Sequence, residues 1–351
     1  ARNLQRRREK VSAMKVTFFG VQPYDREAFD RAGAAYGFEI CYHRSHLNAQ
    51  NVALASGADA VCIFVNDTAD AETIRQLAEM GVKLIALRCA GFNNVDLTAA
   101  VRHGVSVVRV PAYSPHAVAE HAVALMLSLN RKIHRAYWRT RDGNFSLHGL
   151  LGFDMYGKTA GIVGTGRIAR ELIRILKGFG MEVLANDPHP DERFAWEAGI
   201  SYVALDELYE RSDVISLHCP LTDGTRYMIG DVAIGRMKPG VMIINTGRGQ
   251  LIHTEALIDG LKEKKIGAAG LDVYEEEAAY FYEDTSDRIM DDDVLARLLS
   301  FNNVIVTSHQ AFFTREALDN IAHVTLQNML EFDAGKKLTN IVCPDPVAGM
   351  A

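Results

Sequence analysis

The sequence predicts an α/β protein built from two doubly wound, Rossmann-like domains, each with a parallel sheet. Short apolar runs alternate with amphipathic segments along most of the 351 residues, and such alternation is typical of βαβ units. A chain of this length can form two hydrophobic cores. Pro111 interrupts the alternation, and a second series of apolar runs begins further along.

The first series starts at Met14. Apolar and β-branched runs bounded by polar residues predict buried strands. These runs are residues 15–20, 59–65, 83–88 and 105–110. Apolar residues at helical spacing predict helices near residues 25–36, 70–80 and 94–103. After Pro111, Ser114 and Pro115 begin a long helical stretch, 115–131.

The second series predicts another sheet. Its strand-like runs are 159–163, 182–186, 213–217, 241–245, 267–271 and 303–307, with helical patterns between most of them. The chain becomes helical again near 312–314 and stays so to about Gly335. We therefore expect a discontinuous domain of residues 14–112 and 313–345, and a second domain of residues 113–312. Residues 1–13 are Arg-rich without an apolar segment, so we interpret them as a leader or an added extension.

Composition excludes several classes of function. The formal net charge is −6, whereas surfaces that bind nucleic acids are usually basic, so we expect no nucleic-acid partner. No apolar stretch approaches the roughly 20 residues that span a bilayer, so we expect no membrane contact. The five cysteines have no CxxC spacing. That pattern indicates neither disulfides nor a metal site and fits the reducing cytoplasm.

Residues 158–173 read KTAGIVGTGRIARELI and resemble a dinucleotide-binding turn between a strand and a helix. Gly164 permits the tight turn, and Gly166 lets backbone N–H groups approach a pyrophosphate. The small Ala169 lets the helix pack close to the strand, and the helix N-terminus favours the phosphates. Asp187 ends the next predicted strand, where it would accept hydrogen bonds from ribose hydroxyls and repel a 2′-phosphate. The motif therefore predicts NAD rather than NADP.

Three polar side chains follow predicted strands: Arg248, Glu277 and His309. In a parallel sheet, ligands bind outside the carboxyl ends of the strands. Arginine can hold a carboxylate through two hydrogen bonds. Each residue also has a simpler interpretation. Arg248 could form a surface salt bridge, Glu277 could be a solvated acid among acidic neighbours, and His309 could be structural.

Hydride transfer connects these residues to the dinucleotide turn. Oxidation of a secondary alcohol needs a base for the hydroxyl proton, and an imidazole with an ordinary pKa of about 6.5 suits this task near neutral pH. A carboxylate on the second ring nitrogen would orient the imidazole and stabilise its charged form. The residues thus favour redox chemistry on a small acid.

Several longer segments indicate a family. They are 87–96 LRCAGFNNVD, 110–115 VPAYSP, 164–169 GTGRIA, 216–221 SLHCPL, 245–249 NTGRG, 272–275 DVYE and 309–312 HQAF. With these segments the chain resembles the D-isomer-specific 2-hydroxyacid dehydrogenases over residues 14–344. Among their branches it is most similar to the fermentative D-lactate dehydrogenases. The resemblance implies an active site in the cleft between a substrate-binding domain, 14–112 with 313–345, and an NAD-binding domain, 113–312.

The resemblance also implies roles for individual residues. Arg248 would bind the substrate and polarise its carbonyl, Glu277 would pair with the histidine, and His309 would be the general acid/base. The implied NAD contacts are Gly164, Gly166, Arg167, Ile168, Asp187, Cys219, Pro220, Thr225, Thr246, Gly247 and Asp272, the last beside the nicotinamide carboxamide. The implied substrate contacts are Ala90 and Gly91 through backbone N–H groups, Arg248, and Tyr113 and Phe312 as aromatic walls.

The aromatic walls favour a small apolar side chain, so the resemblance predicts the reduction of pyruvate to D-lactate with NADH. One alternative is a dehydrogenase for a bulkier 2-keto acid such as 2-ketoisocaproate. Another is an NAD-sensing regulatory protein on the same fold. The family implies a homodimer, or a dimer of dimers, formed through the helix 115–131. It implies no metal and fits a cytoplasmic location.

Overall fold

The structure is a computed structural model that describes residues 13–277, 280–282 and 284–344. Contacts between Cα atoms divide the chain into two compact units. Unit 1 comprises the residues up to Ser114 and from Thr314 onward, and unit 2 comprises Pro115–Phe313. The expected leader lies outside the described residues, except for Ala13. Each unit is built on a parallel sheet, which confirms the predicted α/β class with two doubly wound domains.

Among its described residues, unit 1 has a five-stranded parallel sheet in the order β2-β1-β3-β4-β5. The strands are β1 (Lys15–Phe18), β2 (Glu39–Tyr42), β3 (Ala60–Ile63), β4 (Leu84–Leu87) and β5 (Ser106–Val108). This order is that of a flavodoxin-like sheet. The sequence prediction missed β2. This edge strand is only partly buried, and its residues EICY lack the continuous apolar run of the central strands.

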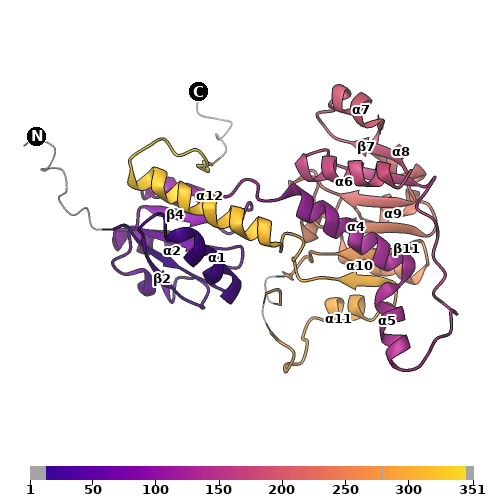
Figure 1. Ribbon diagram of the computed structural model, residues 1–351, viewed down its shortest axis with the longest axis horizontal. Helices are drawn as coiled ribbons and strands as arrows, with labels where there is room; N and C mark the ends of the chain where they lie inside the picture. The colour runs from indigo at the N-terminus through magenta and orange to yellow at the C-terminus, as the bar shows by residue number, and fades with distance from the viewer. Residues whose placement is uncertain (1–12, 278–279, 283, 345–351) are drawn as a thin grey trace, which may run out of the picture. The chain divides into compact units, whose positions relative to one another are not determined.

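The helices of unit 1 include one from the far end of the chain. They are α1 (Pro23–Gly33), η1 (Val52–Ala55), α2 (Ala71–Glu79), α3 (Leu97–Arg102) and α12 (Arg315–Asp333). Helix α12 packs against α1 and against β4, and Figure 1 shows it in yellow beside the indigo α1. The C-terminal helix therefore completes the core of unit 1.

Unit 2 has a seven-stranded parallel sheet among its described residues, in the order β12-β11-β10-β9-β6-β7-β8. The strands are β6 (Thr159–Val163), β7 (Glu182–Asn186), β8 (Ser201–Tyr202), β9 (Val214–Leu217), β10 (Val241–Asn245), β11 (Ile266–Leu271) and β12 (Val304–Val306). Read from β8, this is the Rossmann order 3-2-1-4-5-6 with one more strand. The chain order reverses between β6 and β9, where such sheets bind dinucleotides.

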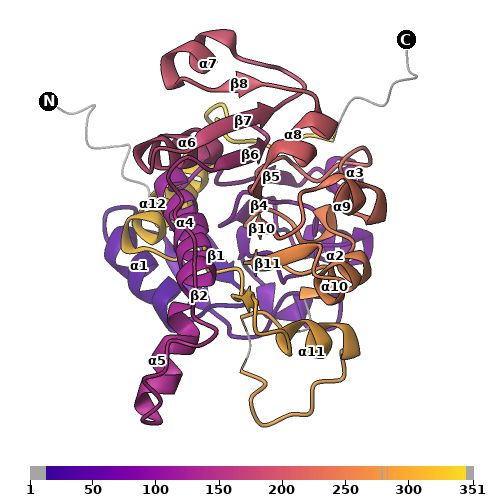
Figure 2. The same ribbon diagram turned by 90° about the vertical axis from the view of Figure 1, so that its right-hand side faces the viewer.

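Helices cover both faces of this sheet. They are α4 (Pro115–Arg131), α5 (Ile133–Arg141), α6 (Arg167–Gly178), α7 (Glu192–Ala198), α8 (Leu205–Arg211), α9 (Asp231–Arg236), η2 (Gly249–Leu251), α10 (Thr254–Lys262) and α11 (Asp293–Leu299). Figure 2 shows α4 and α6 on one face and α9 and α10 on the other. Two buried clusters match this layering, because one combines side chains of α4 and α6 and the other those of α8, α9 and α10.

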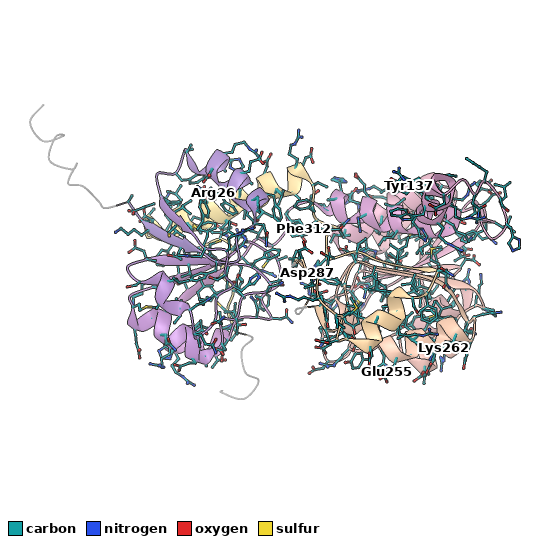
Figure 3. The ribbon with its side chains drawn as sticks, turned by 90° about the horizontal axis from the view of Figure 1, so that it is seen from below. Arg26, Tyr137, Glu255, Lys262, Asp287 and Phe312 are labelled. Atoms are coloured by element: carbon teal, nitrogen blue, oxygen red, sulfur yellow. The ribbon has the colours of Figure 1, made fainter. Side chains whose placement is uncertain are left out.

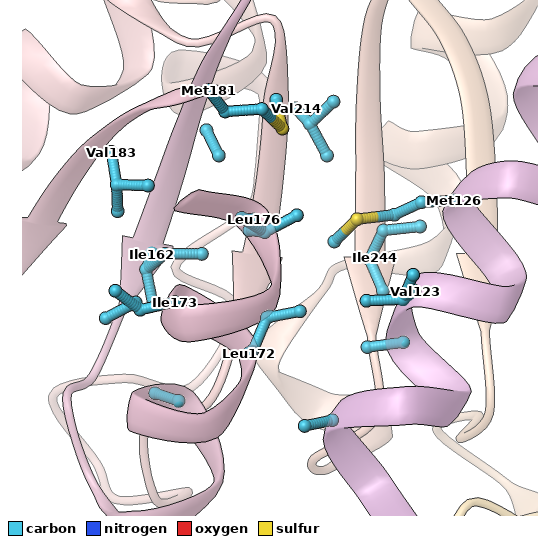
Figure 4. Close-up of a cluster of buried hydrophobic side chains, with 14 of the residues drawn as sticks. Val123, Met126, Ile162, Leu172, Ile173, Leu176, Met181, Val183, Val214 and Ile244 are labelled. Carbon is cyan, nitrogen blue, oxygen red and sulfur yellow. The ribbon is translucent and has the colours of Figure 1, made fainter. Parts of the chain in front are cut away.

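The first cluster fixes the helix that carries the dinucleotide turn. Leu172, Ile173 and Leu176 of α6 are fully buried against the sheet, with Met126 of α4 beside Ile244 of β10 (Figure 4). Each buried aliphatic side chain contributes roughly 1.5–3 kcal/mol relative to exposure. The start of α6 is therefore held firmly at the end of β6.

Two elements of unit 2 were missed by the sequence prediction. Strand β8 has only two residues at the sheet edge, too few for a period-2 pattern. Helix α5 buries none of its residues, and its sequence IHRAYWRTR is rich in polar side chains, so no apolar run marks it. Figure 3 shows Tyr137 of α5 among the side chains of this helix.

Helix ends in unit 2 follow the expected chemistry. Asp191 accepts a hydrogen bond from Phe194 N and begins α7, and Asp292 accepts from two N–H groups of α11. Glu255 lies in the first turn of α10 and Lys262 in the last (Figure 3). Their charges complement the helix dipole.

Candidate active site

Glu277 and His309 face each other beyond the carboxyl ends of β11 and β12. His309 Nδ1 lies 2.8 Å from Glu277 Oε1, and Glu277 Oε2 accepts a hydrogen bond from Tyr274 N at 3.0 Å. The imidazole is 16% exposed and the carboxylate side chain 24%. Glu277 is thus a histidine partner and not a fully solvated acid. With Nδ1 directed at the carboxylate, Nε2 is the ring nitrogen that can exchange a proton with a substrate.

The backbone of His309 adopts an unusual conformation. Its φ is +53°, in the left-handed region, which costs a non-glycine residue about 1–3 kcal/mol unless its surroundings impose it. His309 N donates to Asp272 O at 2.7 Å, and Tyr282 Oη donates to His309 O at 3.0 Å. Gln310 N and Ala311 N donate to the two carboxylate oxygens of Asp272 at 2.9 and 2.8 Å. Asp272, expected only as a cofactor contact, therefore holds the turn that carries His309.

Arg248 follows β10 in a turn that Asn245 shapes. Asn245 is buried, its Nδ2 donates to Arg248 O at 2.9 Å, and its Oδ1 accepts from Gly247 N at 3.0 Å. A Cβ on Gly249 would lie 2.1 Å from the carbonyl carbon of Tyr274, so this turn packs directly on the segment after β11. The Arg248 guanidinium donates to Gly247 O at 2.8 Å, and in the described part of the chain it has no carboxylate partner. Its positive charge is available to an anion.

The dinucleotide turn lies at the switch point between β6 and β9. Gly164 has φ +87°, and a Cβ there would lie 2.7 Å from Cys219 N. A side chain at Gly166 would meet nothing within 4 Å, which leaves open space at the start of α6. Ala169 is buried in the first turn of that helix. A glycine that permits close packing, followed by open space at a helix N-terminus, fits a bound pyrophosphate.

Asp187 is tied to this turn. Its Oδ2 accepts from Thr165 N at 2.7 Å and from Thr165 Oγ1 at 2.9 Å, and its Oδ1 accepts from His189 N at 2.9 Å. Burial acts to raise the pKa of Asp187, but these hydrogen bonds outweigh it and the pKa lies below its ordinary value. The carboxylate is therefore negatively charged at neutral pH, at the position where an adenosine ribose would be recognised.

Thr246 supplies an independent indication of a ligand. Its Oγ1 is buried and has no hydrogen-bond partner among the described residues. A buried hydroxyl without a partner costs about 1–3 kcal/mol. Thr246 lies at the carboxyl end of β10, so the hydroxyl fits a polar group of a dinucleotide, and the residues present fit NAD.

The other expected cofactor contacts lie on the same edge of the unit 2 sheet. Arg167 and Ile168 begin α6. Cys219 and Pro220 follow β9, and Thr225 Oγ1 donates to Pro220 O at 2.7 Å. The structure thus brings the expected NAD contacts together around the carboxyl ends of β6, β7, β9, β10 and β11.

Of the five expected substrate contacts, three belong to unit 1, and Arg248 and Phe312 belong to unit 2. Ala90 and Gly91 follow β4, and their N–H groups have no acceptor among the described residues. Arg109 Nη1 fixes this loop by donating to Ala90 O at 2.9 Å. Tyr113 also lies in unit 1, where its carbonyl accepts from Asn320, whereas Phe312 is buried in unit 2. Free N–H groups at a strand end suit a carboxylate.

Sequence reasoning missed the residues that hold the site in place. Asn245, Tyr282 and the side chain of Asp272 position the catalytic candidates through the bonds above. A buried asparagine at the end of an apolar strand could have indicated Asn245. No comparable signal marks Tyr282, because its contact depends on how the segment after β11 folds back.

Within the described residues, no group of three His, Cys, Asp or Glu side chains is arranged to hold a metal ion. None of the helices over the same residues has the length and apolar character required to cross a membrane.

Comparison with known proteins places the chain in a family. A family model described as D-isomer specific 2-hydroxyacid dehydrogenase, NAD binding domain, matches residues 123–311. A 2-hydroxyacid dehydrogenase homolog of Haemophilus influenzae is 53% identical over 331 residues, which cover 94% of this chain and 100% of that protein. This chain belongs to the D-isomer specific 2-hydroxyacid dehydrogenase family. The resemblance inferred from the sequence is thereby confirmed.

Similar proteins in the family have been named and solved. The D-lactate dehydrogenase of Escherichia coli is 51% identical over 327 residues, 93% of this chain and 99% of that enzyme. Its apo-structure matches with a TM-score of 0.86 at 50% identity, over 94% of this chain and 100% of that one. The pyruvate reductase of Chlamydomonas reinhardtii matches with a TM-score of 0.89 at 45% identity, over 94% and 99%.

A D-lactate dehydrogenase from Lactobacillus jensenii, solved with NAD+, matches with a TM-score of 0.80 at 32% identity, over 94% of this chain and 100% of that one. The NAD-binding domain of the family confirms the predicted cofactor. As a member of this family, the protein is an NAD-dependent D-2-hydroxyacid dehydrogenase.

Proposed function

We propose that this dehydrogenase reduces pyruvate to D-lactate with NADH, reversibly. The observation that carries the proposal is the His309–Glu277 pair at 2.8 Å, together with Arg248, which follows β10 and has no carboxylate partner among the described residues. A proton donor and an anion anchor at the same edge of one sheet are what the reduction of a 2-keto acid requires. The names of the Escherichia coli and Chlamydomonas reinhardtii relatives support pyruvate as the substrate.

His309 acts as the general acid in this direction. It begins as the imidazolium and donates the proton on Nε2 to the carbonyl oxygen of the substrate. Glu277 holds the ring through Nδ1 and stabilises its positive charge. When bound, NADH supplies the hydride that reduces the carbonyl carbon. In the reverse direction, neutral His309 takes up the hydroxyl proton of D-lactate.

Arg248 binds the substrate carboxylate and polarises the adjacent carbonyl. A guanidinium can donate two parallel hydrogen bonds to a carboxylate, which also fixes its orientation. We propose that the free N–H groups of Ala90 and Gly91 bind the same carboxylate, and that Tyr113 and Phe312 limit the size of the substrate side chain. Unit 1 is then the substrate-binding domain.

Unit 2 is the NAD-binding domain in this proposal. The turn at Gly164 and Gly166 receives the pyrophosphate, and Asp187 accepts hydrogen bonds from the ribose. The Thr246 hydroxyl, buried without a partner among the described residues, hydrogen-bonds the cofactor. Asp272 lies beside the nicotinamide carboxamide and also holds the His309 turn.

An absorbance assay tests the proposal directly. NADH oxidation is measured with pyruvate and with 2-ketoisocaproate, and the chirality of the product is determined with stereospecific enzymes. We expect a higher kcat/KM for pyruvate and D-lactate as the product. A preference for the larger acid would indicate the bulkier-substrate alternative. NADH binding without turnover of any 2-keto acid would indicate an NAD-sensing protein and contradict the enzymatic proposal.

We also propose a homodimer, or a dimer of dimers, and place its interface on α5 and residues 142–156, which we call the α5 surface. Leu147 is 82% and Leu151 88% exposed there, which is unusual for a surface that stays in water. The segment is nevertheless fixed, because Asn130 bonds both the N–H and the carbonyl of Phe153. A pocket of about 360 Å³ lies between Arg131 and residues 147–154.

The expected helix, α4, buries most of its apolar side chains within unit 2, so the α5 surface is the better candidate for a second copy of the chain. Light scattering after size exclusion tests this. The double variant L147D/L151D should be monomeric, whereas V232D, at an exposed valine on α9, should keep the wild-type mass.

A cytoplasmic location is part of the proposal and agrees with five unpaired cysteines.

A further inference from the structure

A chain of hydrogen bonds connects α4 to the buried carboxylate of Asp272. His121 Nε2 lies 3.1 Å from Thr307 Oγ1 and 3.4 Å from Asp272 Oδ1. Thr307 Oγ1 in turn donates to Asp272 Oδ1 at 2.6 Å. Because the hydroxyl proton of Thr307 is directed at the carboxylate, its oxygen is free to accept from His121. His121 Nε2 is therefore the donor that begins the chain.

Asp272 needs these donors because its side chain is 0% exposed. A buried carboxylate is stable only when its oxygens accept hydrogen bonds or meet a positive charge. Oδ1 accepts from Thr307 Oγ1 and Gln310 N, and Oδ2 accepts from Ala311 N. Among the described residues, no basic side chain other than His121 lies within ion-pair distance of the Asp272 carboxylate. His121 itself is 18% exposed.

The same carboxylate holds the turn with His309. Its two oxygens receive the N–H groups of the two residues after His309, while the Asp272 carbonyl receives His309 N at 2.7 Å. These bonds keep His309 at its positive φ of 53°. A rotation of the Asp272 carboxylate would release the turn and displace the imidazole from Glu277.

We propose that His121 is a positioning residue for catalysis, acting through Thr307 and Asp272 to fix the turn that presents His309. This role of His121 rests on the proposed function, in which His309 transfers the proton. His121 lies on α4, which is not part of the dinucleotide motif. Among the described residues, no hydrogen bond or ion pair joins His121 to Glu277 or His309, so its effect on the reaction passes through the Asp272 carboxylate.

Two variants separate the donor from the shape of the side chain. H121F keeps a planar ring but has no N–H group, whereas H121Q carries an amide N–H that can reach the position of Nε2. The matched control is H116F, because His116 lies on the same helix and is 67% exposed. The variants are compared in the full chain by kcat and KM for pyruvate at saturating NADH. Hydrogen exchange of the peptide that spans residues 307–312 is the second measurement.

We expect H121F to lower kcat about 10-fold, the upper value of one hydrogen bond between neutral groups, with a smaller change in KM. Exchange of the 307–312 peptide should become faster by a similar factor. H121Q should recover both to within about threefold, and H116F should match the wild type. T307V combined with H121F should cost no more than either change alone, since both break one chain.

The inference is overturned if H121F keeps wild-type kcat and exchange, if H121Q is no better than H121F, or if the effects of H121F and T307V add. Failure of the proposed function gives a different result. In that case the wild type shows no turnover of any 2-keto acid. H121F still accelerates exchange of the 307–312 peptide and H121Q restores it, which supports the positioning role without the reaction.

Discussion

His309 Nδ1 and Glu277 Oε1 lie 2.8 Å apart although the two residues are separated by 32 positions in the chain. The sheet brings them together, because β11 and β12 are parallel neighbours with Leu271 paired to Val306. Each catalytic candidate follows its strand by a few residues and emerges at the same edge. The pairing of two strands thereby creates an acid/base pair.

Replacing Glu277 by glutamine tests this pair. The new amide can still accept a hydrogen bond from the ring but carries no negative charge to stabilise the imidazolium. We expect kcat for pyruvate reduction to fall about 10- to 100-fold, the contribution of one hydrogen bond to a charged group, while KM changes less. E276Q is the matched control, because Glu276 is an exposed neighbour. Equal kcat values for E277Q and E276Q would remove Glu277 from the mechanism.

Arg248 should respond to the geometry of its head group as well as to its charge. Lysine in R248K keeps the positive charge but cannot form two parallel hydrogen bonds to a carboxylate. We expect kcat/KM for pyruvate to fall about 10- to 100-fold, the contribution of one charged hydrogen bond, and further in R248Q. R226K, at an exposed arginine, serves as the control. Steady-state kinetics with wild-type values for R248K would assign the substrate carboxylate to other groups.

Asp187 should determine the choice between NADH and NADPH. Its carboxylate is negatively charged and already oriented by Thr165 and His189, so a 2′-phosphate would be repelled. We expect D187N to raise KM for NADH about tenfold, in keeping with one lost charged hydrogen bond. The ratio of kcat/KM for NADPH to that for NADH should rise. T165V, which removes a hydroxyl but keeps the backbone N–H, should change this ratio much less. An unchanged ratio in D187N would contradict the assignment.

Much of the fold could be predicted because its strands are buried on both faces. Strands such as β6 and β10 read as uninterrupted apolar runs, and the turn at Gly164 has a specific sequence pattern. Edge elements gave weaker signals. Strand β8 is too short for a pattern, and α5 has no buried face, so neither follows from local sequence.

The candidate site was predictable to a different degree at each residue. Position after a strand indicated Arg248 and His309, but Glu277 could be distinguished from Glu275 and Glu276 only through the family. The structure gives the physical difference. Glu275 accepts from Thr254 N at the start of α10, whereas Glu277 meets the histidine. The roles of Asn245, Thr307 and Asp272 depend on contacts between distant segments, and local patterns do not encode such contacts.

We expect His218, which follows β9, to make a pH-dependent contribution to the free energy of unfolding. Its Nε2 lies 2.8 Å from Ser216 Oγ, and burial lowers the pKa of His218 from 6.5 to about 4. The unfolded chain therefore takes up this proton first as the pH falls. The stabilisation is fully present above pH 6.5 and is lost as the pH falls toward 4.

Denaturant unfolding of the wild type and of H218Q, measured at pH 7 and near pH 4.5, checks this prediction. A glutamine does not titrate, so the wild type should lose up to about 2 kcal/mol more than H218Q over this interval. This value allows for the partial exposure of the ring, since a full pKa unit corresponds to about 1.4 kcal/mol. H148Q, at an exposed histidine, should follow the wild type. Parallel losses in H218Q and the wild type would mean that His218 takes up its proton equally in the folded and unfolded chain.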